Sequence, residues 1–399
     1  MKCPYCGSKR TIKNGKRLIQ SIWIDRHTHR KIKRYKCKDC QKSFCLRREK
    51  KKKYTYKFKL EVVRMHIEER QSYRVISKRI KEKTGKKISA GSLCKMVNEV
   101  AVKTKGSIKI KEEYSPKWEG YLTVDDKYVN IKGRKFVSLA AIDSSGDPIH
   151  SELLNEGIQN EYDEFFKFII QHLEYPVKSV TTDLDGMLEK SIKTVLRGDI
   201  PYQKCLRHAM EAIMRLLDYQ STQKRYFWLN NPNRNQYVTH KINLKELKAK
   251  RQIIEKEYKQ KKELISSLKK LLYYKDPIKS EQQYEKLKEE YGKKYPEVIK
   301  FLEKNLTNLL THQKYTKIPK TNNIAENYNR QIMRRLKTIE AFQSIETAFN
   351  YLNLVRNYLR FKPYTDCRGK RRIRNGKSPM ELCQVKLSCK DWLKHSLLN

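Results

Sequence analysis

A series of short apolar segments in the first half of the chain places the strongest limit on its fold. Each segment is rich in apolar and β-branched residues, and Gly, Asp or Ser residues separate them, which is typical of successive β-strands. The predicted strands span residues 121–131, 135–143, 148–154 and 177–183, and a predicted helix spans residues 161–173. We therefore expect a β-β-β-α-β unit, that is, a mixed sheet covered by helices.

Acidic residues lie where such a sheet would bring side chains together. Asp125 is in the first predicted strand and Asp183 ends the fourth, so we expect the two carboxylates to meet near the strand ends. Alternation along the first strand puts Asp125 and Asp126 on opposite faces and does not choose between them. Asp183 is preferred to Asp185 because it terminates the apolar strand.

Two further motifs follow this unit in order. The first is Cys205-Leu-Arg-His208, and the second is a late helical segment, Thr321-Asn-Asn-Ile-Ala-Glu326-Asn-Tyr-Asn-Arg330. With the two aspartates, they resemble the catalytic core of DDE transposases, above all those of insertion sequences and the Mutator-like group. The resemblance implies an RNase H-like fold, selects Asp125 over Asp126, and implies Asp125, Asp183 and Glu326 as catalytic ligands of two Mg²⁺ or Mn²⁺ ions.

The charge of the chain indicates a polyanionic partner. There are 90 Lys and Arg residues against 44 Asp and Glu, for a formal net charge of +46. Nucleic-acid phosphate is the favoured counter-charge, although a Lys-rich proteome would raise the same count. No apolar run is long enough for a transmembrane helix, and the first residues lack the apolar segment of a secretory signal.

Two Cys-x-x-Cys pairs predict a structural metal site near the N-terminus. Cys3 and Cys6 form one pair and Cys37 and Cys40 the other, and four thiolates suit tetrahedral Zn²⁺. The spacer exceeds the common zinc-ribbon range, but its apolar pattern fits a long β-hairpin between the pairs. Residues 1–46 resemble the zinc ribbon that opens many insertion-sequence transposases.

Three helical segments follow within residues 54–104. Ser72 is a plausible N-cap of the second and Gly85 ends it, and the order predicts a helix-turn-helix whose third helix enters the major groove. Ser92, Lys95 and Asn98 would then face the bases. A small helical bundle without a role in DNA binding is the alternative.

The remaining chain divides by composition. We expect the catalytic core at 118–218, an all-helical insertion at 219–320, the second part of the core with the Glu326 helix at 321–362, and a basic C-terminal tail at 363–399. Arg330 and Arg334 follow Glu326 at four-residue steps and would contact DNA phosphates on one helix face, or else form a solvated face. His208 would either contact DNA and support the site or pack in the core. Ordinary core packing is favoured over base stacking for the aromatic run at residues 226–228.

The fold class expected from the sequence is therefore α/β and multidomain: zinc ribbon, helix-turn-helix and an RNase H-like mixed sheet interrupted by a helical insertion. The resemblance implies a DNA transposase that binds the terminal inverted repeats of an insertion sequence, cleaves them and transfers them to target DNA. It also implies a homodimer or larger homo-oligomer in the cytoplasm of a prokaryotic cell, associated with the nucleoid. Two alternatives are a non-catalytic DNA-binding regulator derived from a transposase and an RNase H-like nuclease with another nucleic-acid substrate.

Overall fold

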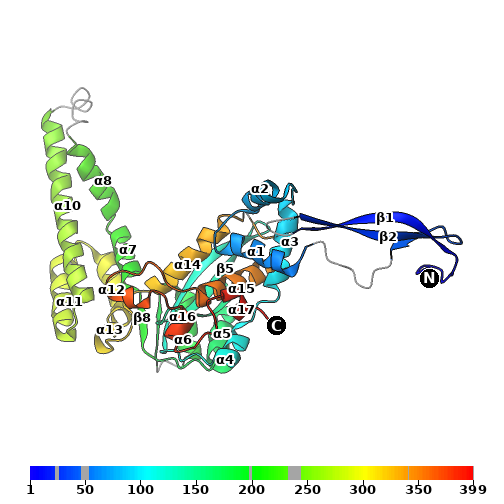
Figure 1. Cartoon of the computed structure of the whole chain (residues 1–399). Helices are drawn as coiled ribbons and strands as arrows, with labels where there is room; N and C mark the ends of the chain where they lie inside the picture. The colour runs from blue at the N-terminus through cyan, green and yellow to red at the C-terminus, as the bar shows by residue number, and fades with distance from the viewer. Residues whose placement is uncertain (23–26, 46–53, 197–199, 232–243, 340, 399) are drawn as a thin grey trace.

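The structure is a computed structural model that describes residues 1–22, 27–45, 54–196, 200–231, 244–339 and 341–398. It is a mixed α/β protein with a central five-stranded sheet, a separate helical region and a small N-terminal sheet beside four cysteines. Figure 1 shows the helical region and the N-terminal arm on opposite sides of the central sheet. The predicted α/β class is confirmed at this level. Residues 23–26 of the expected hairpin between the cysteine pairs lie outside the described residues, as do residues 46–53.

The central sheet has the strand order β6-β5-β4-β7-β8. Strands β4, β5 and β6 are antiparallel neighbours, whereas β4, β7 and β8 run parallel. The bounds are Tyr121–Ile131 (β4), Arg134–Asp143 (β5), Pro148–Asn155 (β6), Ser179–Thr182 (β7) and Tyr202–Lys204 (β8). The predicted β-β-β-α-β order is confirmed, and the short edge strand β8 was not predicted.

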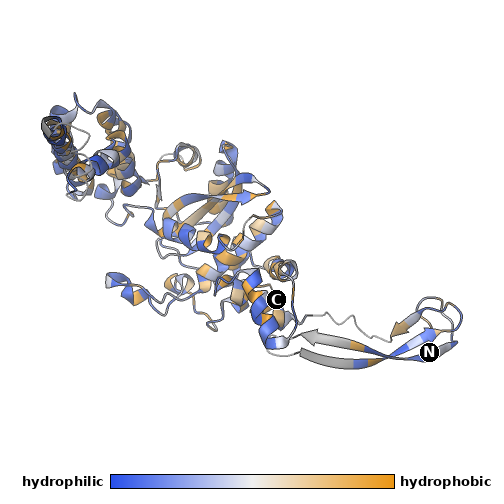
Figure 2. Ribbon diagram, turned by 90° about the horizontal axis from the view of Figure 1, so that it is seen from above, coloured by the Kyte–Doolittle hydropathy of each residue, from blue (hydrophilic) through white to orange (hydrophobic). Residues whose placement is uncertain are grey.

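Alternation along the strands divides the apolar side chains between two faces of the sheet. Leu122 and Val124 of β4 pack with one helical layer, and Val129 and Ile131 of the same strand pack with the other. The first layer is α5 (Gln159–Lys167), the π-helical turn η1 (Phe168–His172) and α6 (Gly186–Val195). Figure 2 shows the strands of this sheet as largely hydrophobic, as a sheet covered on both faces requires.

The second layer combines helices from both ends of the chain in one continuous core. These helices are α1 (Tyr56–Ile67), α2 (Tyr73–Thr84), α3 (Ala90–Ala101), α4 (Ser107–Tyr114), α14 (Asn323–Leu336), α15 (Ile345–Phe361), α16 (Pro379–Leu382) and α17 (Trp392–Ser396). The hydroxyl of Ser72 accepts a hydrogen bond from the Val75 N–H, and Gly85 ends α2 at φ 70°. The predicted N-cap and the predicted C-terminal glycine of this helix are therefore both present. The helices of 54–104 share their core with the sheet.

The helical region has a core of its own. It contains α7 (Leu206–Leu216), α8 (Tyr219–Leu229), α10 (Leu244–Tyr273), α11 (Pro277–Tyr291), α12 (Pro296–Leu309) and α13 (Thr311–Lys314). Asp276 caps α11 by accepting from the Ile278 N–H, and Pro277 occupies the first turn, where its missing N–H costs no hydrogen bond. The apolar face of α7, expected in the catalytic core, packs in this region.

The N-terminal sheet is a long twisted arm (Figure 1). It is formed by β1 (Thr11–Ile22), β2 (His27–Cys37) and β3 (Ser43–Cys45), in that order. The N-terminus lies at the end of the arm that is away from the central sheet. Lys16 lies directly opposite Lys33 in the ladder, so like charges face each other across the arm.

A buried ion pair joins α15 to the turn between β5 and β6. The Arg360 Nε lies 2.7 Å from the Asp147 Oδ1, and both side chains have 0% exposure. Arg360 also donates to the Pro148 carbonyl, and the Trp118 indole donates to Asp147. Because the charges are paired and hydrogen-bonded, their burial is tolerated, but loss of one partner would leave the other uncompensated.

We expect Asp147→Ala to lower the free energy of unfolding by about 3–5 kcal/mol, because it strands the buried Arg360 guanidinium. Chemical denaturation followed by circular dichroism measures this change. Glu112→Ala, which removes an exposed pair with Lys109 at 3.4 Å, is the control and should cost less than about 1 kcal/mol. Equal effects of the two substitutions would contradict the structural role of the buried pair.

Candidate functional site

Asp125 lies on the face of β4 that is covered by α14. Its side chain is 7% exposed. The Asn322 amide donates to one carboxylate oxygen at 2.8 Å, and the Asn329 amide donates to the other at 2.7 Å. Two neutral donors fix the carboxylate without neutralising its charge. A cation bound there would therefore meet an oriented anion.

Asp183 reaches the same place because β4 and β7 run parallel. Thr123 pairs with Thr181, and Asp125 and Asp183 are each two residues further along, so they come together at the ends of neighbouring strands. Ligand oxygens of Asp125, Asp126 and Asp183 all lie within 4.8 Å of one another. Asp185 instead caps α6 by accepting from the N–H groups of Met187 and Leu188, which separates its role from that of Asp183.

Burial and mutual repulsion oppose ionisation of this aspartate group. Burial, with repulsion from Asp183, Asp126 and Glu326, raises the pKa of Asp125 to about 7, although the Asn329 hydrogen bond lowers it. Burial and repulsion from Asp183 and Asp185 raise the pKa of Asp126 to about 6. Burial likewise raises the pKa of Asp183. Oxygen ligands whose charges repel are a suitable site for Mg²⁺ or Mn²⁺, and these residues could hold such ions.

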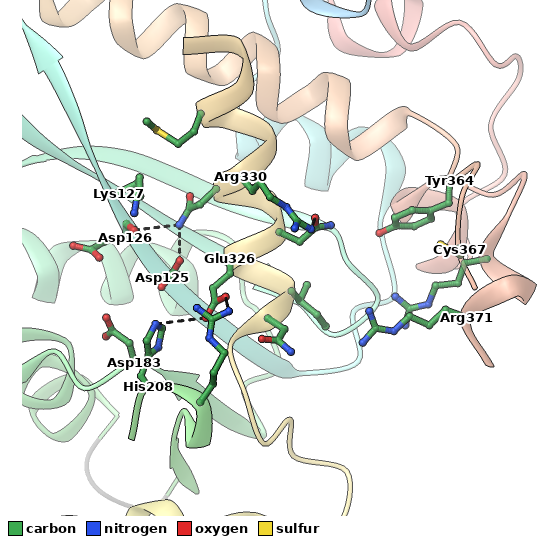
Figure 3. Close-up of a pocket in the computed structure, with 17 residues that line it drawn as sticks. Asp125, Asp126, Lys127, Asp183, His208, Glu326, Arg330, Tyr364, Cys367 and Arg371 are labelled. Carbon is green, nitrogen blue, oxygen red and sulfur yellow. Dashed lines mark hydrogen bonds and ion pairs between the residues drawn. The ribbon is translucent and has the colours of Figure 1, made fainter. Parts of the chain in front are cut away.

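Glu326 lies in the first turn of α14 and has different immediate partners. Its carboxylate forms an ion pair with Arg207 at 2.6 Å, and the His208 Nε2 lies 3.6 Å from it. A carboxylate oxygen of Glu326 and the ligand atoms of Cys205 and His208 all lie within 4.8 Å of one another. The Cys205/His208 pair thus has a nearby carboxylate. Figure 3 shows Glu326 on the same side of α14 as Asp125 and Asp183.

One cavity of about 840 Å³ contains these acids (Figure 3). Of the residues predicted for the site, Asp125, Asp183, His208, Glu326 and Arg330 line it, and the exposed Arg334 does not. Sequence reasoning missed several lining residues: Asp126, Arg207, Asn329, Tyr364, Cys367, Arg371 and Arg374. The spacing of Asn329 three residues after Glu326 could have placed it on the same helix face, whereas no local pattern indicates the four residues after 362.

The four N-terminal cysteines meet as predicted. The Sγ atoms of Cys3 and Cys40 are 3.6 Å apart, as are those of Cys6 and Cys37. All four Sγ atoms lie within 4.8 Å of one another. Hydrogen bonding from the Cys40 backbone N–H lowers the pKa of Cys37 to about 7, whereas the neighbouring thiols and burial raise that of Cys6 to about 12 despite hydrogen bonding from the Ser8 backbone. Cys37 is therefore the thiol of this pair that loses its proton first. The cluster could therefore hold Zn²⁺.

The three residues predicted to read bases lie along one side of α3. Lys95 is exposed, whereas Ser92 and Asn98 are half-buried. The Ser92 hydroxyl is 2.9 Å from that of the capping residue Ser89, and the Asn98 amide approaches the Cys94 sulfur at 3.8 Å. None of the three lines the cavity of the acids.

The prediction of core packing for residues 226–228 is wrong for two of the three aromatic residues. Tyr226 stacks on Tyr258 with ring centroids 4.5 Å apart. Phe227 and Trp228 are 57% and 45% exposed. The pattern of α8 places them on the outer face of the helix because Thr222 and Leu229 take its buried positions.

Comparison with known families decides what the second half of the chain is. Residues 246–361 match the family described as "Transposase, Mutator family". This segment is a Mutator-family transposase domain. The domain runs from α10 to the last residue of α15 and contains Glu326, Asn329 and Arg330, whereas Asp125 and Asp183 precede it. No curated protein matches the chain.

The match confirms the suspected Mutator family for residues 246–361, and a transposase domain implies binding to DNA. Across the described residues, no helix combines the length and the apolar composition that crossing a membrane requires.

Metal binding by the aspartate group should depend on pH. Because the pKa values of Asp125 and Asp126 are raised to about 7 and about 6, a cation must displace protons below these values. We expect the affinity for Mn²⁺ to fall at least about tenfold from pH 8 to pH 5.5. Calorimetric titration measures this, and Asp125→Asn should weaken both the binding and its pH dependence.

The raised pKa values of Asp125 and Asp126 also determine how the stability of the folded protein changes with pH. The folded protein holds these protons at pH values where the unfolded chain has lost them. The metal-free protein should therefore lose stability as pH rises from about 4, the loss should level off above about 7, and added Mn²⁺ should restore the stability. A pH-independent affinity would contradict the ionisation of this group.

Loss of one N-terminal thiol should empty the cysteine site. We expect Cys37→Ser to remove about one zinc ion per chain, since three remaining ligands bind zinc far more weakly. Atomic absorption measures the zinc, and limited proteolysis should show cleavage confined to the N-terminal arm. Cys94→Ser on α3 is the control and should keep the zinc.

Proposed function

We propose that this chain is a DNA transposase that cleaves the ends of an insertion sequence and joins them to target DNA, with divalent metal ions as cofactors. The single observation that carries the proposal is the meeting of Asp125 and Asp183 in one cavity with Glu326 of the Mutator-family transposase domain. These are the three acids that the resemblance implies. Their convergence from three separate segments supports a common chemical role.

The residues present suit the proposed metal ions. Asp125 is held by two neutral amides and Asp183 lies beside it, and burial together with repulsion from neighbouring acids raises the pKa values of both carboxyl groups. A divalent cation bound among these oxygens would relieve that repulsion. Divalent ions, when bound, would activate the attacking oxygen and compensate negative charge on the phosphate. Asp125, Asp183 and Glu326 are the residues that would hold them.

Glu326 must then exchange partners. Its contacts with Arg207 and His208 hold the carboxylate outside the aspartate group, although all of these residues line one cavity. Release of Glu326 toward Asp125 and Asp183 would free Arg207 to contact a DNA phosphate. In this proposal, His208 supports the site by orienting Glu326.

The other parts of the chain fit proposed roles in DNA binding. The sheet order and strand directions support an RNase H-like core at 118–218 and 321–362, interrupted by the helical insertion at 219–320. We propose a zinc ribbon at 1–46 and a helix-turn-helix at 54–104 with Ser92, Lys95 and Asn98 toward the bases. Arg330, which lines the cavity, and Arg334 would contact phosphates, and the basic tail begins at 363. We also propose a homo-oligomer that holds paired transposon ends within a prokaryotic cell.

One observation favours a second candidate, a DNA-binding regulator without catalysis. Glu326 is ion-paired away from the aspartates, as it would be in a transposase body that no longer turns over. The two candidates differ in their response to metal. An enzyme gains strand cleavage when Mg²⁺ or Mn²⁺ is added, whereas a regulator binds DNA and leaves it intact.

We expect Asp125→Ala to reduce cleavage and strand transfer by at least about a thousandfold, because it removes a proposed metal ligand. Gel assays with DNA carrying the inverted repeats that flank the gene measure both reactions and end binding. End binding should change less than about threefold, because the residues proposed to read the bases, Ser92, Lys95 and Asn98, do not line the cavity that contains Asp125. Retained cleavage would refute the assignment.

Two further variants sharpen this test. Asp126→Asn probes the neighbouring acid on the opposite face of β4, and its effect on cleavage should be smaller than that of Asp125→Asn. Asp276→Asn alters a half-buried helix cap in the helical region, outside the cavity of the acids, and should leave the reaction unchanged. If Asp126→Asn reduces cleavage more than Asp125→Asn does, then Asp126 and not Asp125 has the proposed catalytic role.

A further inference from the structure

The C-terminal segment returns to the cavity that contains the acids. Tyr364, Cys367, Arg371 and Arg374 line it together with Asp125, Asp183 and Glu326. We call these four residues the C-terminal wall. Figure 3 shows Tyr364 and Arg371 pointing from this segment toward α14, from which Arg330 extends toward them. The wall begins just after residue 361, the end of the match to the transposase family.

Specific contacts hold the wall in place. The Tyr364 N–H donates to the Lys377 carbonyl, and the Gly376 N–H donates to the Tyr364 carbonyl, which closes residues 364–377 into a loop. The Cys367 N–H donates to the Asn375 side chain. The Tyr364 hydroxyl lies against Gly146, where a Cβ would be only 2.2 Å away and φ is +99°. The close packing on this glycine fixes the loop against the β5–β6 turn.

The charge of the wall is not balanced by the protein. The 3₁₀ turn η2 (Gly369–Arg374) has the sequence Gly-Lys-Arg-Arg-Ile-Arg and contains no buried residue. Among the ion pairs formed by the described residues, none uses Arg330, Arg371 or Arg374, although acids line the same cavity. Arg374 donates hydrogen bonds to the carbonyls of Ser144 and Ser145, at 3.4 and 3.5 Å, and these neutral acceptors do not balance its charge. An external anion is the remaining counter-charge.

We propose that the C-terminal wall binds the phosphates of a DNA strand and seats that strand against the carboxylates of the cavity. This inference rests on the proposed function, since it places the scissile strand between the wall and the acids. Arg371 is the principal contact because it is exposed and unpaired among the described residues. Arg330 would contact the strand from α14 on the other side.

The arrangement has a physical reason. Repulsion between like charges opposes the approach of a phosphodiester to a group of carboxylates, and positive charge near its path reduces this repulsion. The metal ions would supply charge at the reacting phosphate, and the guanidinium groups would supply it at the neighbouring phosphates. Arginine suits this role because its fork can donate two hydrogen bonds to one phosphate.

Cys367 provides a local probe of the wall. Its thiol lines the cavity and is half-buried, so a bound strand should shield it. The experiment measures alkylation of Cys367 by N-ethylmaleimide in the full-length zinc-loaded protein, by mass spectrometry, without added divalent metal. The DNA is a short duplex of arbitrary sequence with a single-stranded 3′ extension. Cys389, which is half-buried at the His395 side chain outside the cavity, is the internal control.

We expect saturating DNA to slow alkylation of Cys367 at least about fivefold and to leave Cys389 unchanged. The DNA concentration for half-protection should rise roughly tenfold in Arg371→Ala, as expected for the loss of a charge-assisted hydrogen bond. Arg372→Ala is the matched control: it is the next residue, equally charged and exposed, but it does not line the cavity. It should change half-protection less than about twofold. Arg371→Glu should weaken protection further.

Equal alkylation of Cys367 with and without DNA would overturn the proposal, and equal effects of Arg371→Ala and Arg372→Ala would overturn the assignment of Arg371. Failure of the proposed function gives a different result. Protection is measured without catalysis, so it would persist even if Asp125→Ala retained cleavage. Conversely, if Asp125→Ala loses cleavage but DNA does not protect Cys367, the proposed transposase function stands and DNA binding by the C-terminal wall is refuted.

Discussion

The close approach of Asp125 and Asp183 is the interaction on which the rest of the site depends. It follows from the parallel pairing of β4 and β7, which aligns residues that are far apart in the chain. Bringing buried carboxylates together is unfavourable, and the raised pKa values of Asp125 and Asp126 reflect this cost. The surrounding structure compensates only in part, through amides that orient Asp125 without adding charge. The unbalanced charge is what makes the site suitable for a metal.

The remaining architecture keeps this unfavourable arrangement in place. α14 supplies Asn329 and Glu326 on one face, and its apolar residues Ala325 and Ile332 are buried in the core that covers the sheet. α15 locks the β5–β6 turn through the buried pair between Arg360 and Asp147. The helices of 54–104 share this core, so a change in their packing could reach the site through α14 and α15.

Local patterns predicted much of the fold. Period-two alternation and turn residues gave β4 to β7 within a few residues, and Ser72 and Gly85 marked the ends of α2 correctly. Alternation along a strand was enough to predict that Asp125 and Asp126 lie on opposite faces of β4. The short β8 was missed because three residues carry too little pattern, and its role as a strand depends on pairing with β7.

The composition of the site was harder to predict for a physical reason. Asp125, Asp183 and Glu326 were selected by resemblance, and the structure places them in one cavity, but the ion pair of Glu326 with Arg207 depends on how α7 meets α14. The residues after 362 were expected only as a basic tail. Their return to the cavity is set by the packing of Tyr364 on Gly146, a contact between segments more than 200 residues apart, which no local periodicity encodes.

The N-terminal arm has a consequence for how the protein responds to its surroundings. Lys16 faces Lys33 across a two-stranded ladder, and this repulsion weakens the free arm. Simple salt relieves the repulsion by screening, but the same screening weakens any grip on a polyanion. A bound polyanion relieves the repulsion between Lys16 and Lys33 without the weakening of binding that salt causes. For an arm that binds nucleic acid as proposed, binding and stiffening should occur together in dilute salt, whereas concentrated salt should stiffen the arm while it weakens binding.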